Sequence, residues 1–160
     1  MAAIIRNIEP GDNESLAFIV RHVLKEFNAD KPGTAYFESS TDNIHGVFEK
    51  PRSKYFVAEL DGKVVGGGGI YATDGLPEGY CELVKLYLLK EARGTGLGRS
   101  LLEKCFAWAK GKGYTHVYLE SMTELMDAVG LYIKLGFKYI DHPLGNCGHA
   151  VCGIWMTREL

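Results

Sequence analysis

The first third of the chain combines a short apolar run with one amphipathic segment. Residues 3–8 are rich in isoleucine and predict a short strand. Apolar side chains then recur with the spacing of one helix face over residues 13–27, at Leu16, Ile19, Val20, Val23, Leu24 and Phe27. A weaker periodicity predicts a second short helix over residues 40–50, which Pro51 closes.

The middle of the chain has the pattern of β structure. Two β-rich runs, residues 53–60 and 63–73, flank Asp61-Gly62, a dipeptide that tolerates positive φ at both turn positions and therefore predicts a hairpin. The second run contains Gly66–Gly69, which weaken a strand and indicate a bulge or the close approach of another backbone or a ligand. A tightly packed strand is the alternative. Residues 80–89 predict a further, long strand.

The last third alternates helices with strands. Apolar periodicity predicts helices over residues 97–109 and 126–135, and Gly136 stands where the residue after a helix adopts positive φ. Strands are predicted at residues 115–121, 137–140 and 150–160. The resulting order, β-α-α-β-β-β-α-β-α-β-β, is mixed α/β (α+β) without the regular alternation of a doubly wound sheet.

Length and composition favour one globular domain over residues 1–160. The 160 residues are 46% hydrophobic and 24% charged, so the chain buries a core without disulfides or metals. The net charge is −2 and no basic run is present, which argues against a nucleic acid or an anionic membrane as partner. The chain has neither a signal peptide pattern nor an apolar stretch long enough to span a bilayer, so we expect a cytoplasmic protein.

A stretch near the C-terminus gathers thiols and imidazoles. His142, Cys147, His149 and Cys152 fall within eleven residues, but their spacing matches no standard zinc pattern. We expect a glycine-rich loop near a pocket, with reduced thiols and no metal. A thiol or metal protein built on Cys147, His149 and Cys152 remains an alternative.

Residues 91–102, EARGTGLGRSLL, place three glycines directly before a predicted helix. A helix start carries unpaired N–H groups and the positive end of the dipole, and glycines let a phosphate approach them. Arg93 and Arg99 add charge at the rim. The strict alternation of Gly94, Gly96 and Gly98 matches neither a dinucleotide fingerprint nor a P-loop. A turn that only makes room for helix packing is the alternative to this anion site.

Two motifs resemble those of a known superfamily. Arg93-x-x-Gly96-x-Gly98 after a strand resembles the acetyl-CoA motif of the GCN5-related N-acetyltransferase (GNAT) superfamily, and AVGLYIKLGF over residues 128–137 resembles its second motif, A-x-x-LY-x-x-x-GF. The resemblance extends over nearly the whole chain and is strongest to a bacterial small-molecule-type subgroup. It implies a twisted, mostly antiparallel sheet of six to seven strands with about four helices, acetyl-CoA as co-substrate, and a fold compatible with a homodimer.

The resemblance also implies where the coenzyme lies. Its diphosphate would sit on main-chain amides of the glycine-rich segment, with pantetheine alongside the preceding strand. The implied coenzyme-binding residues are Leu86, Tyr87, Leu88, Arg93, Gly94, Thr95, Gly96, Leu97, Gly98 and Arg99. One departure stands out, because many members have Asn seven residues before the motif tyrosine and this chain has Leu125.

Acetyl transfer to an amine needs a base, and two glutamates compete for the role. Glu82 shares strand parity with Val84, Leu86 and Leu88 and so is expected on an apolar face. It also stands where histone-type members carry their base. Glu120 ends a predicted strand at the position used by members that acetylate ribosomal proteins.

The candidate acid, the oxyanion donor and the residues that contact the acceptor amine come from other parts of the chain. Tyr132 is the candidate acid for the departing thiolate, with a core tyrosine as the alternative, and a strand amide near Leu88 is the candidate oxyanion donor. Phe27, Tyr36 and His149 are the candidate acceptor contacts.

We therefore expect an N-acetyltransferase that moves an acetyl group directly to a primary amine of a small molecule, amino acid or peptide in a ternary complex. A coenzyme-A-binding sensor without turnover remains the second alternative.

Overall fold

The computed structural model describes residues 2–145 and 151–160. Its helices and strands follow the predicted order. They are β1 Ala3–Asn7, α1 Asn13–Glu26, α2 Ile44–Val47, β2 Lys54–Leu60, β3 Lys63–Tyr71, β4 Tyr80–Leu88, α3 Leu97–Gly111, β5 His116–Ser121, α4 Met126–Lys134, β6 Lys138–Ile140 and β7 Ile154–Glu159. Short 3-10 turns connect several of them, including η2 Ala35–Phe37, η3 Ser39–Asn43 and η4 Lys90–Ala92.

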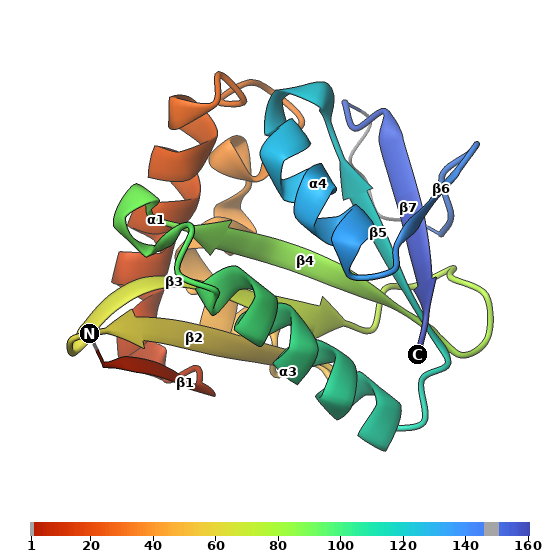
Figure 1. The fold of residues 1–160 in the computed structure, drawn as a ribbon, viewed down its shortest axis with the longest axis horizontal. Coiled ribbons are helices and arrows are strands. Elements are labelled where there is room, and N and C mark those ends of the chain that lie inside the picture. The colour runs from red at the N-terminus through yellow and green to blue at the C-terminus, as the bar shows by residue number, and fades with distance from the viewer. Residues whose placement is uncertain (1, 146–150) are drawn as a thin grey trace.

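The strands form one sheet in the order β1-β2-β3-β4-β5-β7-β6. All neighbours are antiparallel except β4 and β5, which run parallel. A mixed α/β fold with a mostly antiparallel seven-stranded sheet and four helices confirms the predicted class (Figure 1).

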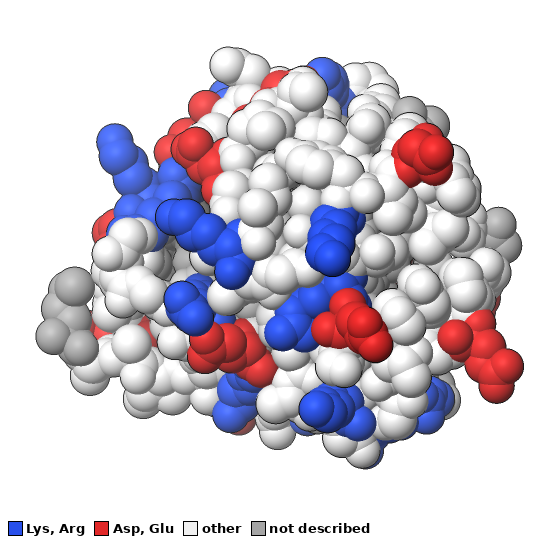
Figure 2. All heavy atoms as spheres, turned by 45° about the vertical axis from the view of Figure 1, so that its right-hand side comes forward, with Lys and Arg blue, Asp and Glu red and all other residues white. Residues whose placement is uncertain are grey.

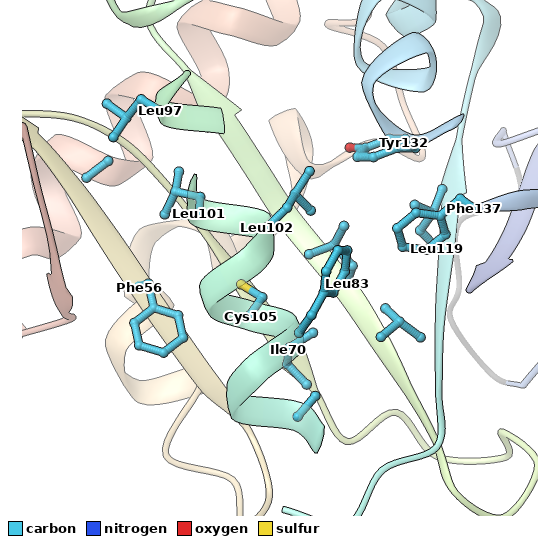
Figure 3. Close-up of a cluster of buried hydrophobic side chains, with 14 of the residues drawn as sticks. Phe56, Ile70, Leu83, Leu97, Leu101, Leu102, Cys105, Leu119, Tyr132 and Phe137 are labelled. Carbon is cyan, nitrogen blue, oxygen red and sulfur yellow. The ribbon is translucent and has the colours of Figure 1, made fainter. Parts of the chain in front are cut away.

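Helices cover both faces of the sheet. On β2, Phe56 and Ala58 share a hydrophobic cluster with α3, α4 and two residues of α1, whereas Tyr55 and Val57 share one with α2 and the rest of the buried face of α1. Alternate side chains of a strand point to opposite faces, so the two clusters lie on opposite sides of the sheet. Figure 3 shows the α3 side, where Cys105 and its leucine neighbours on the helix face the strands.

A bulge interrupts the pairing of β3 with β4, as the glycine run indicated. The register shifts between Gly67 and Gly69, and a Cβ atom on either glycine would lie 2.5 or 2.7 Å from a carbon of the Tyr55 ring. Opposite the shift, Lys85 on β4 has φ 51, a conformation uncommon for a residue with a side chain. The Tyr55 hydroxyl donates a hydrogen bond to the Lys85 carbonyl at 2.8 Å, which holds the bulge in place.

The parallel pair at the centre of the sheet is short. Its register runs only from Tyr80↔His116 to Glu82↔Tyr118, although β4 continues to Leu88 and β5 to Ser121. Beyond these pairs the two strands diverge, and α4 lies across the gap between them (Figure 1). One edge of β4 is therefore left without a β5 partner after Glu82, within the described residues.

Charge is mixed on the face drawn in Figure 2. Basic and acidic side chains are interspersed there rather than gathered in one broad area of a single sign. Among the described residues, no helix combines the length and the apolar character needed to cross a bilayer.

Candidate active site

A cavity of about 920 Å³ opens where β4 and β5 diverge, between α1, α4 and the glycine-rich loop. It brings together most of the residues that the sequence nominated. Those that line it are Phe27, Glu82, Leu86, Tyr87, Leu88, Arg93, Gly94, Gly96, Gly98, Arg99, Glu120 and Tyr132.

The glycine-rich loop exposes the start of α3 to this cavity. Gly94 and Gly96 have φ of 74 and 85, and a Cβ atom on either would have no neighbour within 4 Å. The amide of Ser100 donates to the Gly96 carbonyl at 3.0 Å and that of Leu97 to the Thr95 hydroxyl at 3.4 Å. The amides of Gly98 and Arg99 therefore need partners from outside the helix. The loop therefore has open space and main-chain donors at the same point, which suits an anion.

Two of the nominated coenzyme residues support the loop with their side chains. The Thr95 hydroxyl donates to the Ala92 carbonyl at 2.6 Å, and Leu97 is buried in the α3-side core. Neither residue lines the cavity. Only the main-chain atoms of Thr95 and Leu97 could therefore contact a ligand in the cavity.

Both arginines of the segment already hold a carboxylate. Arg93 donates two hydrogen bonds to Glu26, at 2.7 and 2.8 Å, and a third to the Leu88 carbonyl at 3.0 Å. Its guanidinium also lies over the Phe27 ring, 4.8 Å from the ring centre. The hydrogen bonds from Arg93 lower the pKa of Glu26. The exposed Arg99 forms an ion pair with Glu103 at 2.8 Å. Arg93, through Glu26, connects the end of α1 to the glycine-rich loop.

The two candidate bases lie on one face of the sheet. Glu82 and Tyr118 are register partners across β4 and β5, and Glu120 follows Tyr118 by two residues. Glu82 is only 3% exposed, and its Oε1 accepts a hydrogen bond from the Thr73 hydroxyl at 2.6 Å. Glu120 is half-buried and accepts one from the Tyr118 hydroxyl, also at 2.6 Å.

The expected face of Glu82 is partly wrong. Val84 packs with the α1-side cluster, whereas Leu86 and Leu88 pack with the α3-side cluster. Side chains along β4 alternate between the two faces of the sheet, and the bulge at Lys85 inserts one extra residue into this pattern. Every β4 side chain after the bulge therefore points to the face opposite to the expected one. Glu82 therefore shares its face with Val84 and not with the two leucines.

Tyr132 occupies the α4 wall of the cavity. Its ring packs edge-on against Phe137, with ring centres 5.7 Å apart. In Figure 3 its hydroxyl oxygen lies on the side away from Phe137, toward Leu102. Burial raises the pKa of Tyr132 well above its ordinary value of 10, so the hydroxyl stays protonated and serves as a hydrogen-bond donor.

The predicted acceptor contacts have different outcomes. Phe27 lines the cavity, but Tyr36 does not. The Tyr36 ring packs against Phe37, with centres 5.0 Å apart, and its carbonyl accepts a hydrogen bond from Arg21. The Tyr36 side chain thus packs against Phe37 and is not part of the cavity lining. His149 lies outside the described residues, as does Cys147.

Several cavity residues were missed by the sequence. Thr73 comes from the loop after β3, and Lys85 forms an ion pair with Glu38 at 3.3 Å. Cys152, which the sequence offered only as part of the thiol or metal alternative, also lines the cavity. Burial, with a smaller effect from carboxylates such as Glu120, raises its pKa to about 11. Of the two missed positions, only the bulge at Lys85 had a sequence signal, in the glycines opposite it. Within residues 2–145 and 151–160, no group of three His, Cys, Asp or Glu side chains is arranged to hold a metal.

Comparison with known proteins agrees with this geometry. Residues 18–137 match the family model of the Acetyltransferase (GNAT) family. An uncharacterized N-acetyltransferase, YjgM of Escherichia coli (strain K12), is 38% identical over 98% of this chain and 95% of its own. Among solved structures, an acetyltransferase of the GNAT family from Staphylococcus aureus Mu50 has a TM-score of 0.88, with 21% identity and 99% of each chain covered. The PaiA N-acetyltransferase of Thermoplasma acidophilum, in complex with coenzyme A, has a TM-score of 0.79, with 21% identity and 100% of each chain covered. The chain therefore belongs to the GNAT family of acetyltransferases.

Proposed function

We propose that this protein transfers the acetyl group of acetyl-CoA directly to a primary amine of a small molecule, an amino acid or a peptide, with both substrates bound together. One observation carries the proposal: a single cavity is lined by the glycine-rich loop, the edge of β4, Tyr132 and two glutamates. Each step of acetyl transfer therefore has a candidate group in the same space.

The coenzyme end of the cavity fits acetyl-CoA. The open amides at the start of α3 suit its diphosphate, because helix N-termini favour anions. The unpaired edge of β4 from Leu86 to Leu88 offers main-chain donors and acceptors to the amides of pantetheine, as a neighbouring strand would. The coenzyme A bound by the Thermoplasma relative supports this assignment.

The acceptor must lose a proton before it can attack. An alkylamine has a pKa of about 10.4, so only about one molecule in a few thousand is neutral at pH 7. Glu82 or Glu120 takes that proton, directly or through water, because both carboxylates line the cavity. The amine nitrogen then bonds to the thioester carbon, and a strand amide near Leu88 stabilises the oxyanion.

The departing thiolate is met by Tyr132. As the carbon–sulfur bond breaks, the electron pair stays on sulfur and the amide product is left on the acceptor nitrogen. The ordinary pKa of a tyrosine already exceeds that of a thiol, and burial raises the pKa of Tyr132 further, so full proton transfer from its hydroxyl is unfavourable. Tyr132 therefore stabilises the thiolate by a hydrogen bond, and the thiolate takes its proton from solvent after release.

The state of Cys152 supports direct transfer over a covalent acetyl-enzyme. This thiol lines the cavity, but its pKa of about 11 keeps it protonated at neutral pH. A protonated thiol is a poor nucleophile. The acetyl group thus passes to the amine without an acetyl-cysteine intermediate.

The test is thiol release from acetyl-CoA with a panel of amines. We expect amine-dependent release by the wild type and a loss of about tenfold or more in kcat for Tyr132→Phe. Tyr139→Phe is the matched control, because Tyr139 is exposed on β6. Native mass spectrometry that shows acetyl-CoA bound, with no release for any amine, would instead indicate a sensor. A stoichiometric metal in the purified protein would favour the thiol or metal alternative.

A further inference from the structure

Given the proposed acetyl transfer, on which this rests, we propose that Thr73 is a positioning residue that fixes Glu82 as the general base. Glu120, the other glutamate in the cavity, then has a different task. The case rests on how each carboxylate is held and by which part of the chain.

The contact between Thr73 and Glu82 lies within the cavity lining. Both residues face the cavity, and the hydroxyl donates to Glu82 Oε1 at 2.6 Å. Glu82 is almost fully buried, so its side chain has little freedom apart from rotation about its last bonds. A hydrogen bond to one oxygen fixes that rotation and leaves the plane of the carboxylate in one orientation.

The backbone on either side of Thr73 is itself held by contacts with a different part of the chain. The amide of its neighbour Ala72 donates to the Ser53 hydroxyl at 3.0 Å, and Lys50 donates to the Ala72 carbonyl at 2.5 Å. Lys50 also pairs with Asp74 at 3.1 Å. Residues on both sides of Thr73 are thus anchored to Lys50 and Ser53 in the segment that precedes β2. The position of the hydroxyl is set by this frame, so Thr73 orients Glu82 rather than the reverse.

Glu120 is held in a different way. Tyr118, which donates a hydrogen bond to Glu120, is fully buried and does not line the cavity. The same Tyr118 hydroxyl accepts a hydrogen bond from the Leu144 amide at 3.1 Å. The contact between Glu120 and Tyr118 thus belongs to a link between β5 and the segment after β6. Holding that segment is the task we assign to Glu120.

A double-mutant cycle tests the assignment. Thr73→Val keeps the shape of the side chain and removes the donor, and we expect kcat to fall about ten- to a hundredfold, because misplaced catalytic groups lose rate by such factors. The Kd for acetyl-CoA and the KM for the amine should stay near the wild-type values. In a Glu82→Gln background Thr73→Val should cost less than twofold, because the group that Thr73 positions is already absent. In a Glu120→Gln background the full loss should remain.

Two further variants separate positioning from folding. Thr73→Ser retains the donor, and its kcat should lie within about threefold of the wild-type value. If the role of Thr73 were purely structural, the kcat of Thr73→Ser would be as low as that of Thr73→Val. Thr115→Val removes a hydroxyl that bonds to the Gly79 carbonyl outside the cavity, and it should leave kcat unchanged. Thermal melting of every variant shows whether the fold is retained.

Each outcome decides the matter. A normal kcat for Thr73→Val, or losses that multiply with Glu82→Gln, would overturn the positioning role and leave the proposed function standing. A loss from Thr73→Val that disappears in the Glu120→Gln background would assign the base to Glu120 instead. If the wild type released no thiol with any amine while it bound acetyl-CoA, the proposed function would fall and this inference with it.

Discussion

Substitution of Gly96 by alanine tests whether the start of α3 holds the coenzyme. Gly96 has φ of 85, and a Cβ atom there would have no neighbour within 4 Å, so alanine brings no steric clash with the protein. The left-handed conformation itself costs a residue with a side chain about 1 to 2 kcal/mol. For a chain of this length such a loss lowers Tm by about 2 to 8 °C.

Gly113, just after α3, provides a control with the same backbone conformation. Its φ is 90, and a Cβ atom there would likewise have no neighbour within 4 Å. Gly113→Ala should therefore lower Tm by a similar amount. Gly113 does not line the cavity, whereas Gly96 does, so only the location of the added methyl group differs between the two variants.

Acetyl-CoA affinity separates the two variants. With Gly96→Ala, either the methyl group occupies the space beside the open amides or the backbone relaxes and turns those amides away. In both cases we expect the Kd, measured by isothermal titration calorimetry, to rise at least tenfold, equivalent to about 1.4 kcal/mol. Gly113→Ala should bind as the wild type does. Equal affinities for the two variants would mean that the coenzyme diphosphate does not lie on this loop.

Three other changes have defined outcomes. Glu26→Gln removes the carboxylate that Arg93 holds and should tighten acetyl-CoA binding about two- to fivefold, the size of an exposed ion pair; unchanged or weaker binding in calorimetry would show that Arg93 serves only the fold. In a Cys147→Ser background, alkylation of Cys152 by iodoacetamide should keep accelerating up to pH of about 11, because the folded protein holds its pKa there; a plateau near pH 8.5, the ordinary thiol value, would contradict that burial. Gly67→Ala would place a Cβ atom 2.5 Å from a tyrosine ring and 2.6 Å from a backbone oxygen, and it should destabilise the fold by about 1 to 3 kcal/mol or more in urea denaturation; a wild-type midpoint would refute the close approach.

The order of elements was predictable because it depends on local patterns. The apolar stripe of α1, the Asp61-Gly62 turn and Gly136 after α4 each follow from periodicity or from φ preferences within a few residues. Two motifs nominated the glycine-rich loop and Tyr132, and both line one cavity. These features need no knowledge of which strands pair.

What the sequence missed depends on pairing and on distant contacts. The glycines of β3 indicated a bulge, but the strained residue is Lys85 on the facing strand, and the faces of Leu86 and Leu88 follow from it. Thr73 was expected at the end of the β-rich run over residues 63–73, but β3 ends at Tyr71, and the loop that follows brings Thr73 to Glu82. Neither position carries a local signal.

The short seam between β4 and β5 has a mechanical consequence. The β4–β5 register joins four strands to three through three residue pairs, so we expect the sheet to flex more readily there than elsewhere. A ligand bound between β4 and β5 would contact both halves of the sheet and stabilise both. Amide hydrogen exchange should then slow even in strands that the ligand does not contact. Ligand binding in the cavity would thus make the whole sheet more rigid.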